Sequence, residues 1–146
     1  MTYKHTQIGW LMLAAFIGIA LLFQVLPGPH PSRAVNVSVV TCVLLVVAIL
    51  MGALTVEVDD AAIRLRFGIG LVRKSFRLDE IAACQAVRNK WWWGWGIRLI
   101  PGGWLYNVSG LDAVELVLKN GKIFRIGTDE PQVLNDFIRL KLGQLP

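Results

Sequence analysis

The chain has 146 residues and a formal net charge of +5, with 55% hydrophobic residues and only 17% charged residues. A soluble domain usually carries about a quarter charged residues, so this composition excludes a single soluble globule of even polarity. It also excludes an acidic disordered chain. All ten acidic residues lie from Glu57 onward, and residues 1–56 carry only Lys4 and Arg33 as charges. The sequence therefore divides into an apolar N-terminal third and a charged remainder.

Two long uncharged runs occupy the N-terminal third, at residues 8–26 and 37–56. The nineteen residues of the first run would form about 28 Å of helix, close to the roughly 30 Å hydrocarbon core of a bilayer. Prolines interrupt residues 27–36, so no single helix continues through them. A signal peptide has a shorter apolar stretch, and helices buried in a soluble core show a polar face. Residues 1–56 are therefore predicted to form a two-helix transmembrane hairpin.

The distribution of basic residues predicts how this hairpin is oriented. Five of them flank the two runs on their outer sides, whereas the connecting stretch holds Arg33 alone: Lys4, Arg64, Arg66, Arg73 and Lys74. Basic residues concentrate on the cytoplasmic side of membrane proteins. We therefore expect a multi-pass protein of the cell (inner) membrane with both termini in the cytoplasm, and residues 57–146 as a cytoplasmic domain.

Alternating apolar and polar residues replace the continuous runs in the C-terminal part. Half-buried strands are predicted near residues 54–58, 63–67, 72–78, 81–88, 114–118 and 124–126. In the third of these, Lys74 shares a face with the apolar Val72 and Phe76. Asn120-Gly121 supplies the positive-φ pair of a tight hairpin turn.

The last segment has the period of a helix. Its apolar residues form one stripe, at Leu134, Phe137, Ile138 and Leu142. Thr128, Asp129 and Glu130 offer capping oxygens before it, and Pro131 suits its first turn. The C-terminal part is thus predicted to be a small all-β barrel of about seven strands, closed by a C-terminal α-helix.

Residues 54–142 resemble a known family. LTVEVDDAAIRLRFGIGLVRKSFRLDEIAACQAVR resembles the first four strands of the bacterial pleckstrin-homology-like domain, with its acidic turn, glycine-terminated strand and basic strand. GWGIRLIPGGWLYNVSGLDAVEL and IGTDEP are similar to small uncharacterised bacterial membrane proteins that place this domain after two spans. The resemblance implies a seven-stranded barrel with a C-terminal helix and no enzymatic activity. It implies no common ligand.

No catalytic or metal-binding constellation is recognisable in the sequence. Cys42 and Cys84 form no CxxC pair and have no nearby histidine, so a structural zinc site is not expected. His5 and His30 both lie beside the apolar runs, where they complete no Ser/His/Asp set. We expect neither a cofactor nor a metal, and we do not expect an enzyme.

The densest candidate site is rich in tryptophan. Five of the six tryptophans lie within fourteen residues, and the candidates for a membrane interface or a partner-binding surface are Lys90, Trp91, Trp92, Trp93, Trp95 and Arg98. An indole suits a boundary between water and an apolar phase. Consecutive residues of an extended segment point to opposite faces, so at least one of Trp91–Trp93 is predicted to face outward. In the alternative interpretation several of these rings fill the core.

A second candidate site is basic. Five residues of one predicted strand pair are candidates for binding an anionic headgroup: Arg64, Arg66, Arg73, Lys74 and Arg77. The alternative is a solvated basic face. From Val56 onward thirteen basic residues stand against ten acidic ones, a balance that argues against nucleic acid as a partner.

Together these features favour a non-enzymatic, membrane-anchored interaction module with a pleckstrin-homology-like domain. Its expected partners are the lipid bilayer and either a membrane protein or a second copy of the chain, and it could serve as an accessory or assembly subunit of a membrane complex. The alternative is a peripheral module that binds anionic lipid through the tryptophan-rich loop and the basic strand face.

Overall fold

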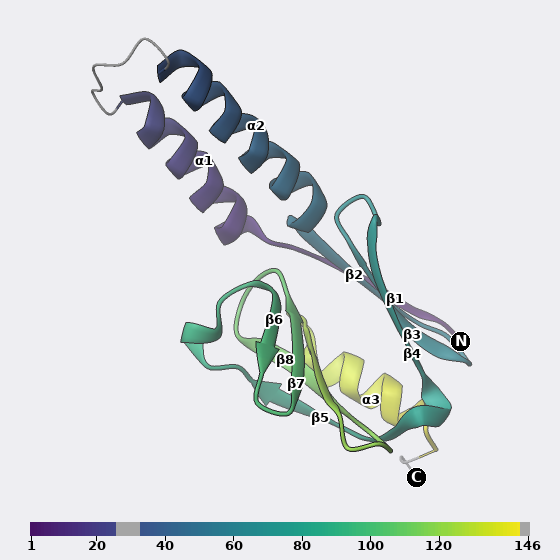
Figure 1. Cartoon of the computed structure of the whole chain (residues 1–146). Coiled ribbons are helices and arrows are strands. Elements are labelled where there is room, and N and C mark those ends of the chain that lie inside the picture. The colour runs from purple at the N-terminus through teal and green to yellow at the C-terminus, as the bar shows by residue number, and fades with distance from the viewer. Residues whose placement is uncertain (26–32, 144–146) are drawn as a thin grey trace.

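The computed structural model describes residues 1–25 and 33–143. Within these residues the chain forms two β-sheets, a pair of helices that projects from the first sheet, and a C-terminal helix (Figure 1). The expected proline-rich turn at residues 27–36 lies largely outside the described residues.

Helices α1 (Trp10–Val25) and α2 (Arg33–Met51) lie side by side (Figure 1). No helix among the described residues is long and apolar enough to cross a membrane. The 16 residues of α1 extend about 24 Å, less than the roughly 28 Å expected from the nineteen-residue apolar run. The expected transmembrane hairpin is therefore wrong. So is the placement of the chain in the inner membrane as a multi-pass protein with both termini in the cytoplasm, because it depended on those spans.

The first sheet explains why the helices are shorter than the apolar runs. Its strands are antiparallel and run in the order β1 (Tyr3–Ile8), β2 (Ala53–Val58), β3 (Ala62–Phe67) and β4 (Val72–Arg77). The start of the first run pairs with the end of the second, with Ile8 opposite Ala53. Both helices are thus inserted between two neighbouring strands, and the domain boundary expected between residues 56 and 57 falls inside β2.

The second sheet has the order β5 (Ile81–Arg88), β8 (Asp112–Leu118), β9 (Ile123–Gly127), β7 (Gly103–Asn107) and β6 (Gly96–Ile100). The hairpin predicted at Asn120-Gly121 is confirmed between β8 and β9, but of the two residues expected to have a positive φ only Gly121 does, at 83°. β7 runs parallel to β9. A Cβ on Gly103 would overlap the carbonyl oxygen of Ile123, so this pairing requires glycine there.

The two sheets do not close into a barrel. Among the described residues no strand pair joins one sheet to the other, and a 3-10 turn at Leu78–Glu80 separates β4 from β5. The predicted seven-stranded barrel is therefore wrong: within the described part of the chain, nine strands form two separate sheets. Strand β1 and the hairpin of β6 and β7 were absent from the predicted strands, because their residues do not alternate clearly between apolar and polar.

Helix α3 (Pro131–Lys141) fills the opening between the sheets on the side of β1 (Figure 1). Leu134 and Ile138 are fully buried in the shared core, which confirms the predicted apolar stripe. Phe137 is only half-buried, with its ring 5.6 Å from that of Tyr3. The expected side-chain cap is not formed, because the N-cap residue Glu130 makes no capping hydrogen bond.

Candidate functional site

The candidate site is the tryptophan loop, residues 90–95, which connects β5 to β6. Trp91–Trp93 form a 3-10 turn, and Gly94 ends it with a φ of 68°. Trp91 is 75% exposed and Trp92 is 60% exposed, and their rings meet edge to face at 5.9 Å. The prediction that at least one of these rings faces outward is confirmed. The alternative, in which several of them fill the core, fails for Trp91 and Trp92.

Trp93 points the other way and anchors the loop to the outer face of the second sheet. Its ring lies 5.0 Å from the guanidinium carbon of Arg125. Arg125 in turn donates to the Glu115 carboxylate at 2.7 Å, and Gln85 donates to the same carboxylate at 2.8 Å. Asn89 accepts a further hydrogen bond from Arg125 at 3.2 Å. Cross-strand pairing of β5, β8 and β9 brings Gln85, Glu115 and Arg125 into one row.

The two basic residues of the predicted site support the loop from either end. The Lys90 ammonium lies 5.2 Å from the centre of the Trp92 ring, within the range of a cation–π interaction. Arg98 donates from Nε to the carbonyl oxygen of Trp95 at 3.0 Å. All six residues predicted for this site therefore belong to one structural unit, in which Trp93 is the anchor and Trp91 and Trp92 are displayed.

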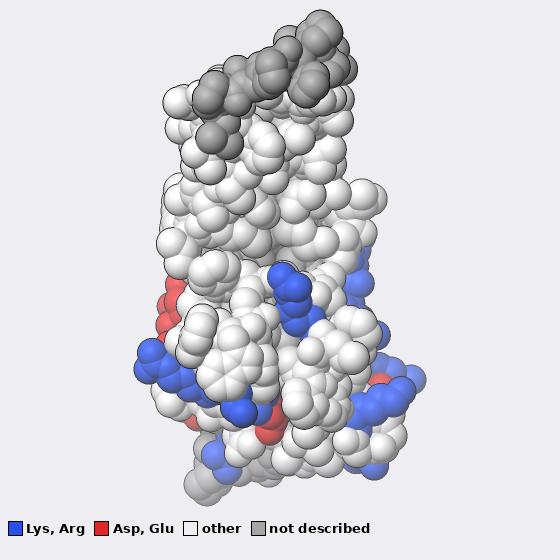
Figure 2. Space-filling model, turned by 60° about the vertical axis from the view of Figure 1, so that its left-hand side comes forward, with Lys and Arg blue, Asp and Glu red and all other residues white. Residues whose placement is uncertain are grey.

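Above the loop the helices present an apolar surface, which we call the helical arm (α1 and α2). Figure 2 shows that the face of the molecule seen there carries no Lys, Arg, Asp or Glu between the charged domain and the residues drawn in grey. A groove of about 450 Å³ lies between the helices, lined by residues that include Trp10, Leu13, Ile17, Leu44 and Ala48. Trp10 is 70% exposed at the start of α1.

The predicted basic site is divided in the structure. Three of its arginines make ion pairs: Arg64 with Asp59, Arg66 with Glu57, and Arg77 with Asp79. The hydrogen bond from Arg77 is the main reason why the pKa of Asp79 is lowered. Arg73 and Lys74 have no carboxylate partner among the described residues. A continuous face of five free cations is thus absent from the described part of the chain.

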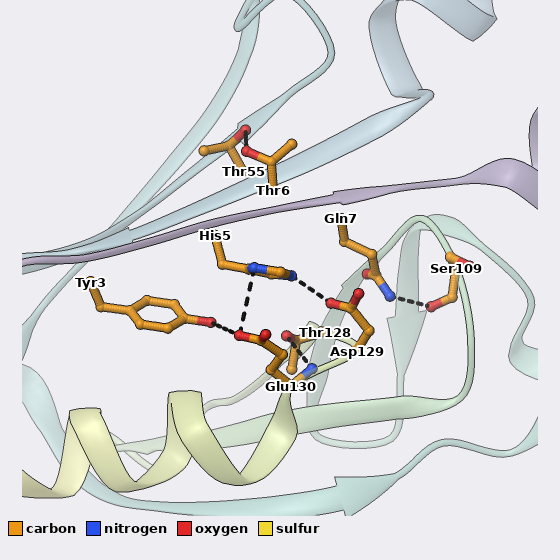
Figure 3. Close-up of polar contacts among 9 residues, drawn as sticks. All are labelled: Tyr3, His5, Thr6, Gln7, Thr55, Ser109, Thr128, Asp129 and Glu130. Atoms are coloured by element: carbon orange, nitrogen blue, oxygen red, sulfur yellow. Dashed lines mark hydrogen bonds and ion pairs between the residues drawn. The ribbon is translucent and has the colours of Figure 1, made fainter.

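A polar cluster that the sequence did not reveal joins β1 to the start of α3 (Figure 3). His5 Nε2 lies 2.6 Å from Asp129 Oδ1, and the Tyr3 hydroxyl donates to Glu130 at 3.4 Å. Burial and then the Glu130 charge raise the pKa of Tyr3 to about 12. Gln7 donates to the Ser109 carbonyl oxygen at 3.2 Å. The two carboxylates expected to cap α3 instead hold the N-terminal strand in place.

Among the described residues, no serine or cysteine side chain bonds to His5 in this cluster. A histidine beside an aspartate suits acid–base chemistry only when a reacting group lies within hydrogen-bonding reach. Within residues 1–25 and 33–143, the His5 ring hydrogen-bonds to Asp129 and lies 3.6 Å from Glu130 Oε2, and it contacts neither a serine hydroxyl nor a cysteine thiol in this way. Thr6 and Thr55 bond to each other on the opposite face of β1 (Figure 3). The cluster therefore serves as a structural clasp.

Comparison with models of known protein families finds none that matches this chain, and comparison with curated proteins finds no relative. The resemblance of residues 54–142 to bacterial pleckstrin-homology-like domains thus stays a prediction. Conclusions about function depend on the geometry of the molecule itself.

Proposed function

We propose that the chain is a non-enzymatic interaction module that binds another protein chain, or a second copy of itself, through the tryptophan loop and the helical arm. One observation carries the proposal: Trp91 and Trp92 are exposed, while their neighbour Trp93 is held on the Arg125–Glu115 ion pair. Tryptophan is enriched among the residues that dominate protein–protein binding energies. Contiguous exposed apolar surface marks interaction sites in the same way.

The loop can contribute substantially to binding. An aromatic side chain buries about 150–250 Å², and apolar burial is worth about 25 cal/mol per Å². Covering the exposed portions of Trp91 and Trp92 would then contribute roughly 5–8 kcal/mol before the cost of association. Because Trp93 and Lys90 already hold the loop, less conformational entropy is lost on binding.

The resemblance to pleckstrin-homology-like domains supports the same proposal, since it implies binding without catalysis. If the chain is an accessory or assembly subunit, it requires a permanent partner in a larger complex. The helical arm favours such a role, because its apolar groove and exposed Trp10 offer a second contact area beside the loop.

Binding to an anionic lipid surface is the second candidate function, and the position of Lys90 over the Trp92 ring favours it. The basic strand face gives it less support than the sequence suggested. Arg64, Arg66 and Arg77 already have carboxylate partners. A protein partner is therefore the better match to the described surface.

A photo-crosslinking amino acid placed at Trp92 in the full chain, expressed in cells, tests the proposal. The control position is Asn120 in the exposed turn between β8 and β9. We expect a discrete protein adduct from position 92 and none from position 120. An adduct of twice 16.2 kDa identifies a second copy, and any other mass identifies a different protein.

Two results would contradict the proposal: no protein adduct from position 92, or the same adducts from both positions. A flotation assay with vesicles of phosphatidylglycerol and phosphatidylcholine separates the lipid alternative. If Trp92→Ser abolishes flotation and position 92 yields no protein adduct, the lipid function replaces the protein-binding one.

A further inference from the structure

A cleft lies between the two sheets on the side that α3 leaves open. It has a volume of about 620 Å³ and lies between the start of β4 and the start of β7. Small-molecule sites in proteins typically measure about 300–1,000 Å³. We call it the intersheet cleft; it is separate from the tryptophan loop and from the groove of the helical arm.

The lining of the intersheet cleft combines an aromatic floor with positive charge. Phe67, Tyr106 and Phe124 belong to the buried core and form the floor, and Trp104 stands at the rim with 42% of its surface exposed. Arg73, Lys74 and Lys122 also line the cleft, and no carboxylate is among its described lining residues.

Lys74 occupies an unusual place for a lysine. It lies on the same face of β4 as Val72 and the buried Phe76, and it pairs with the fully buried Leu65 of β3. Its ammonium lies 5.8 Å from the centres of the Phe76 and Phe124 rings. The Lys74 charge therefore lies near Phe124 of the aromatic floor, while the side chain itself stays exposed to solvent and open to an incoming anion.

Polar groups that could orient a ligand are present beside these cations. No described residue hydrogen-bonds to the Tyr106 hydroxyl, and burial raises the pKa of that phenol, so it stays protonated and can donate. Gly102, with a φ of 86°, and Gly103 bring bare backbone to the wall of the cleft. The Tyr106 hydroxyl and the cations are therefore gathered around an apolar base, with no acidic group among the described lining residues.

We propose that the intersheet cleft binds an anionic amphiphile, a molecule with an aromatic or short acyl body and a phosphate or carboxylate head. The body packs on Phe67, Phe124 and Trp104, and the head lies between Lys74 and Lys122. An anion there removes the mutual repulsion of the cations that share the cleft. This inference is independent of the proposed interaction function, since the cleft contains none of residues 90–95.

Isothermal titration of the full chain in neutral detergent tests the proposal with four probes. Dihexanoyl phosphatidate represents a lipid source, and 2-naphthyl phosphate represents a free metabolite. Dihexanoyl phosphatidylcholine has the same acyl chains without net charge, and inorganic phosphate has the charge without a body. We expect at least one of the first two to bind and both of the last two to bind at least tenfold more weakly. Whichever of the first two binds more tightly identifies the source.

Two double variants are compared. The first, Lys74→Gln/Lys122→Gln, changes lysines inside the cleft, and the second, Lys4→Gln/Lys119→Gln, changes lysines outside it. Both pairs remove the same charge from exposed lysines. A hydrogen bond to a charged group is strong enough that losing the cleft lysines should weaken binding tenfold or more. The outer pair should change it less than about twofold, and Lys74→Arg should retain binding. Shifts of the Gly102 and Gly103 amide resonances locate the probe.

Three outcomes would overturn the inference. Equal weakening by both variant pairs would mean a general charge effect, and equal affinity for the phosphatidate and phosphatidylcholine would mean apolar adsorption alone. Absence of binding by both anionic probes at about 1 mM would mean that the cleft is no site for this class. Circular dichroism of each variant confirms that the fold is kept, and Lys74→Arg gives a second reading if the glutamine variants do not fold.

Discussion

Replacing Arg125 with methionine should destabilise the domain and release the tryptophan loop together. The Arg125 guanidinium makes hydrogen bonds to Glu115 and Asn89 and lies under the Trp93 ring. Methionine keeps much of the side-chain volume but removes the charge and all of these hydrogen bonds. Glu115 is then left as a nearly buried carboxylate with Gln85 as its hydrogen-bonding partner.

The expected loss in the free energy of unfolding follows from the burial of the Arg125–Glu115 ion pair. The Arg125 and Glu115 side chains are 19% and 10% exposed, so their ion pair is mostly shielded from water. Breaking a buried pair by removing one partner costs about 3–5 kcal/mol. Because Gln85 still donates to Glu115, we expect about 3 kcal/mol for Arg125→Met. That is a large part of the 5–15 kcal/mol of a typical domain, so the effect is measurable.

Urea unfolding of the full chain in neutral detergent, followed by tryptophan fluorescence, measures this loss. Arg88→Met is the matched control, since Arg88 is exposed and has no ion pair among the described residues. The double variant Glu115→Gln/Arg125→Met removes both charges and should regain at least half of the loss. A loss below about 1 kcal/mol for Arg125→Met, or no recovery in the double variant, would refute the idea that the ion pair holds the loop.

Three further predictions concern the fold. Gly103→Ala should unfold the domain in circular dichroism because its Cβ would overlap the Ile123 carbonyl, whereas Gly110→Ala has open space and should cost only about 1 kcal/mol of backbone strain. Ile138→Ala should lower the free energy of unfolding by about 2–5 kcal/mol, and a value below about 1 would show that α3 does not complete the core. The pKa of Tyr3 is about 12 when folded, against 10.0 as its ordinary value, so its contribution is fully present below pH about 10 and is lost as the pH rises towards 12. Tyr3→Phe should remove that part of the pH dependence, on the order of 1 kcal/mol because the phenol is partly solvated, and an unchanged pH profile would contradict it.

The sequence predicted local elements well where side-chain periodicity is strong. Most strands of the C-terminal part, the Asn120-Gly121 hairpin and the stripe of α3 follow from spacing alone. Strand β1 does not, because its residues are mostly polar and its partner β2 is distant in the chain. The length of the first uncharged run likewise overestimated α1, since Ile8 at the start of that run belongs to β1 and pairs with Ala53.

The sequence also predicted that at least one ring of the tryptophan triplet faces outward, which is correct, but the alternation it assumed is not present, because the three residues form a 3-10 turn in which the neighbours Trp91 and Trp92 are both exposed. It could not say which ring is anchored. That choice depends on Arg125, which is 32 positions beyond Trp93 and reaches it only through the pairing of β8 with β9. Two charges of opposite sign at the centres of neighbouring strands, Glu115 and Arg125, were the available signal. Opposite charges that face each other across a hairpin stabilise it, and the arginine held in this way can make a cation–π contact with an aromatic ring.

The basic residues show most directly what sequence reasoning can and cannot recover. From their number and proximity, five basic residues of β3 and β4 were predicted to form one anion-binding site. Three of them are instead paired with carboxylates from the neighbouring turns and from β2. The parity of the strand was the better guide, because it placed Lys74 on the same face as Val72 and Phe76. A lysine on a core-facing position is costly unless its ammonium reaches solvent or a ligand. In this fold the Lys74 ammonium reaches the opening of the intersheet cleft. The face of β4 on which this one lysine lies therefore points to a candidate site that the count of neighbouring basic residues did not locate.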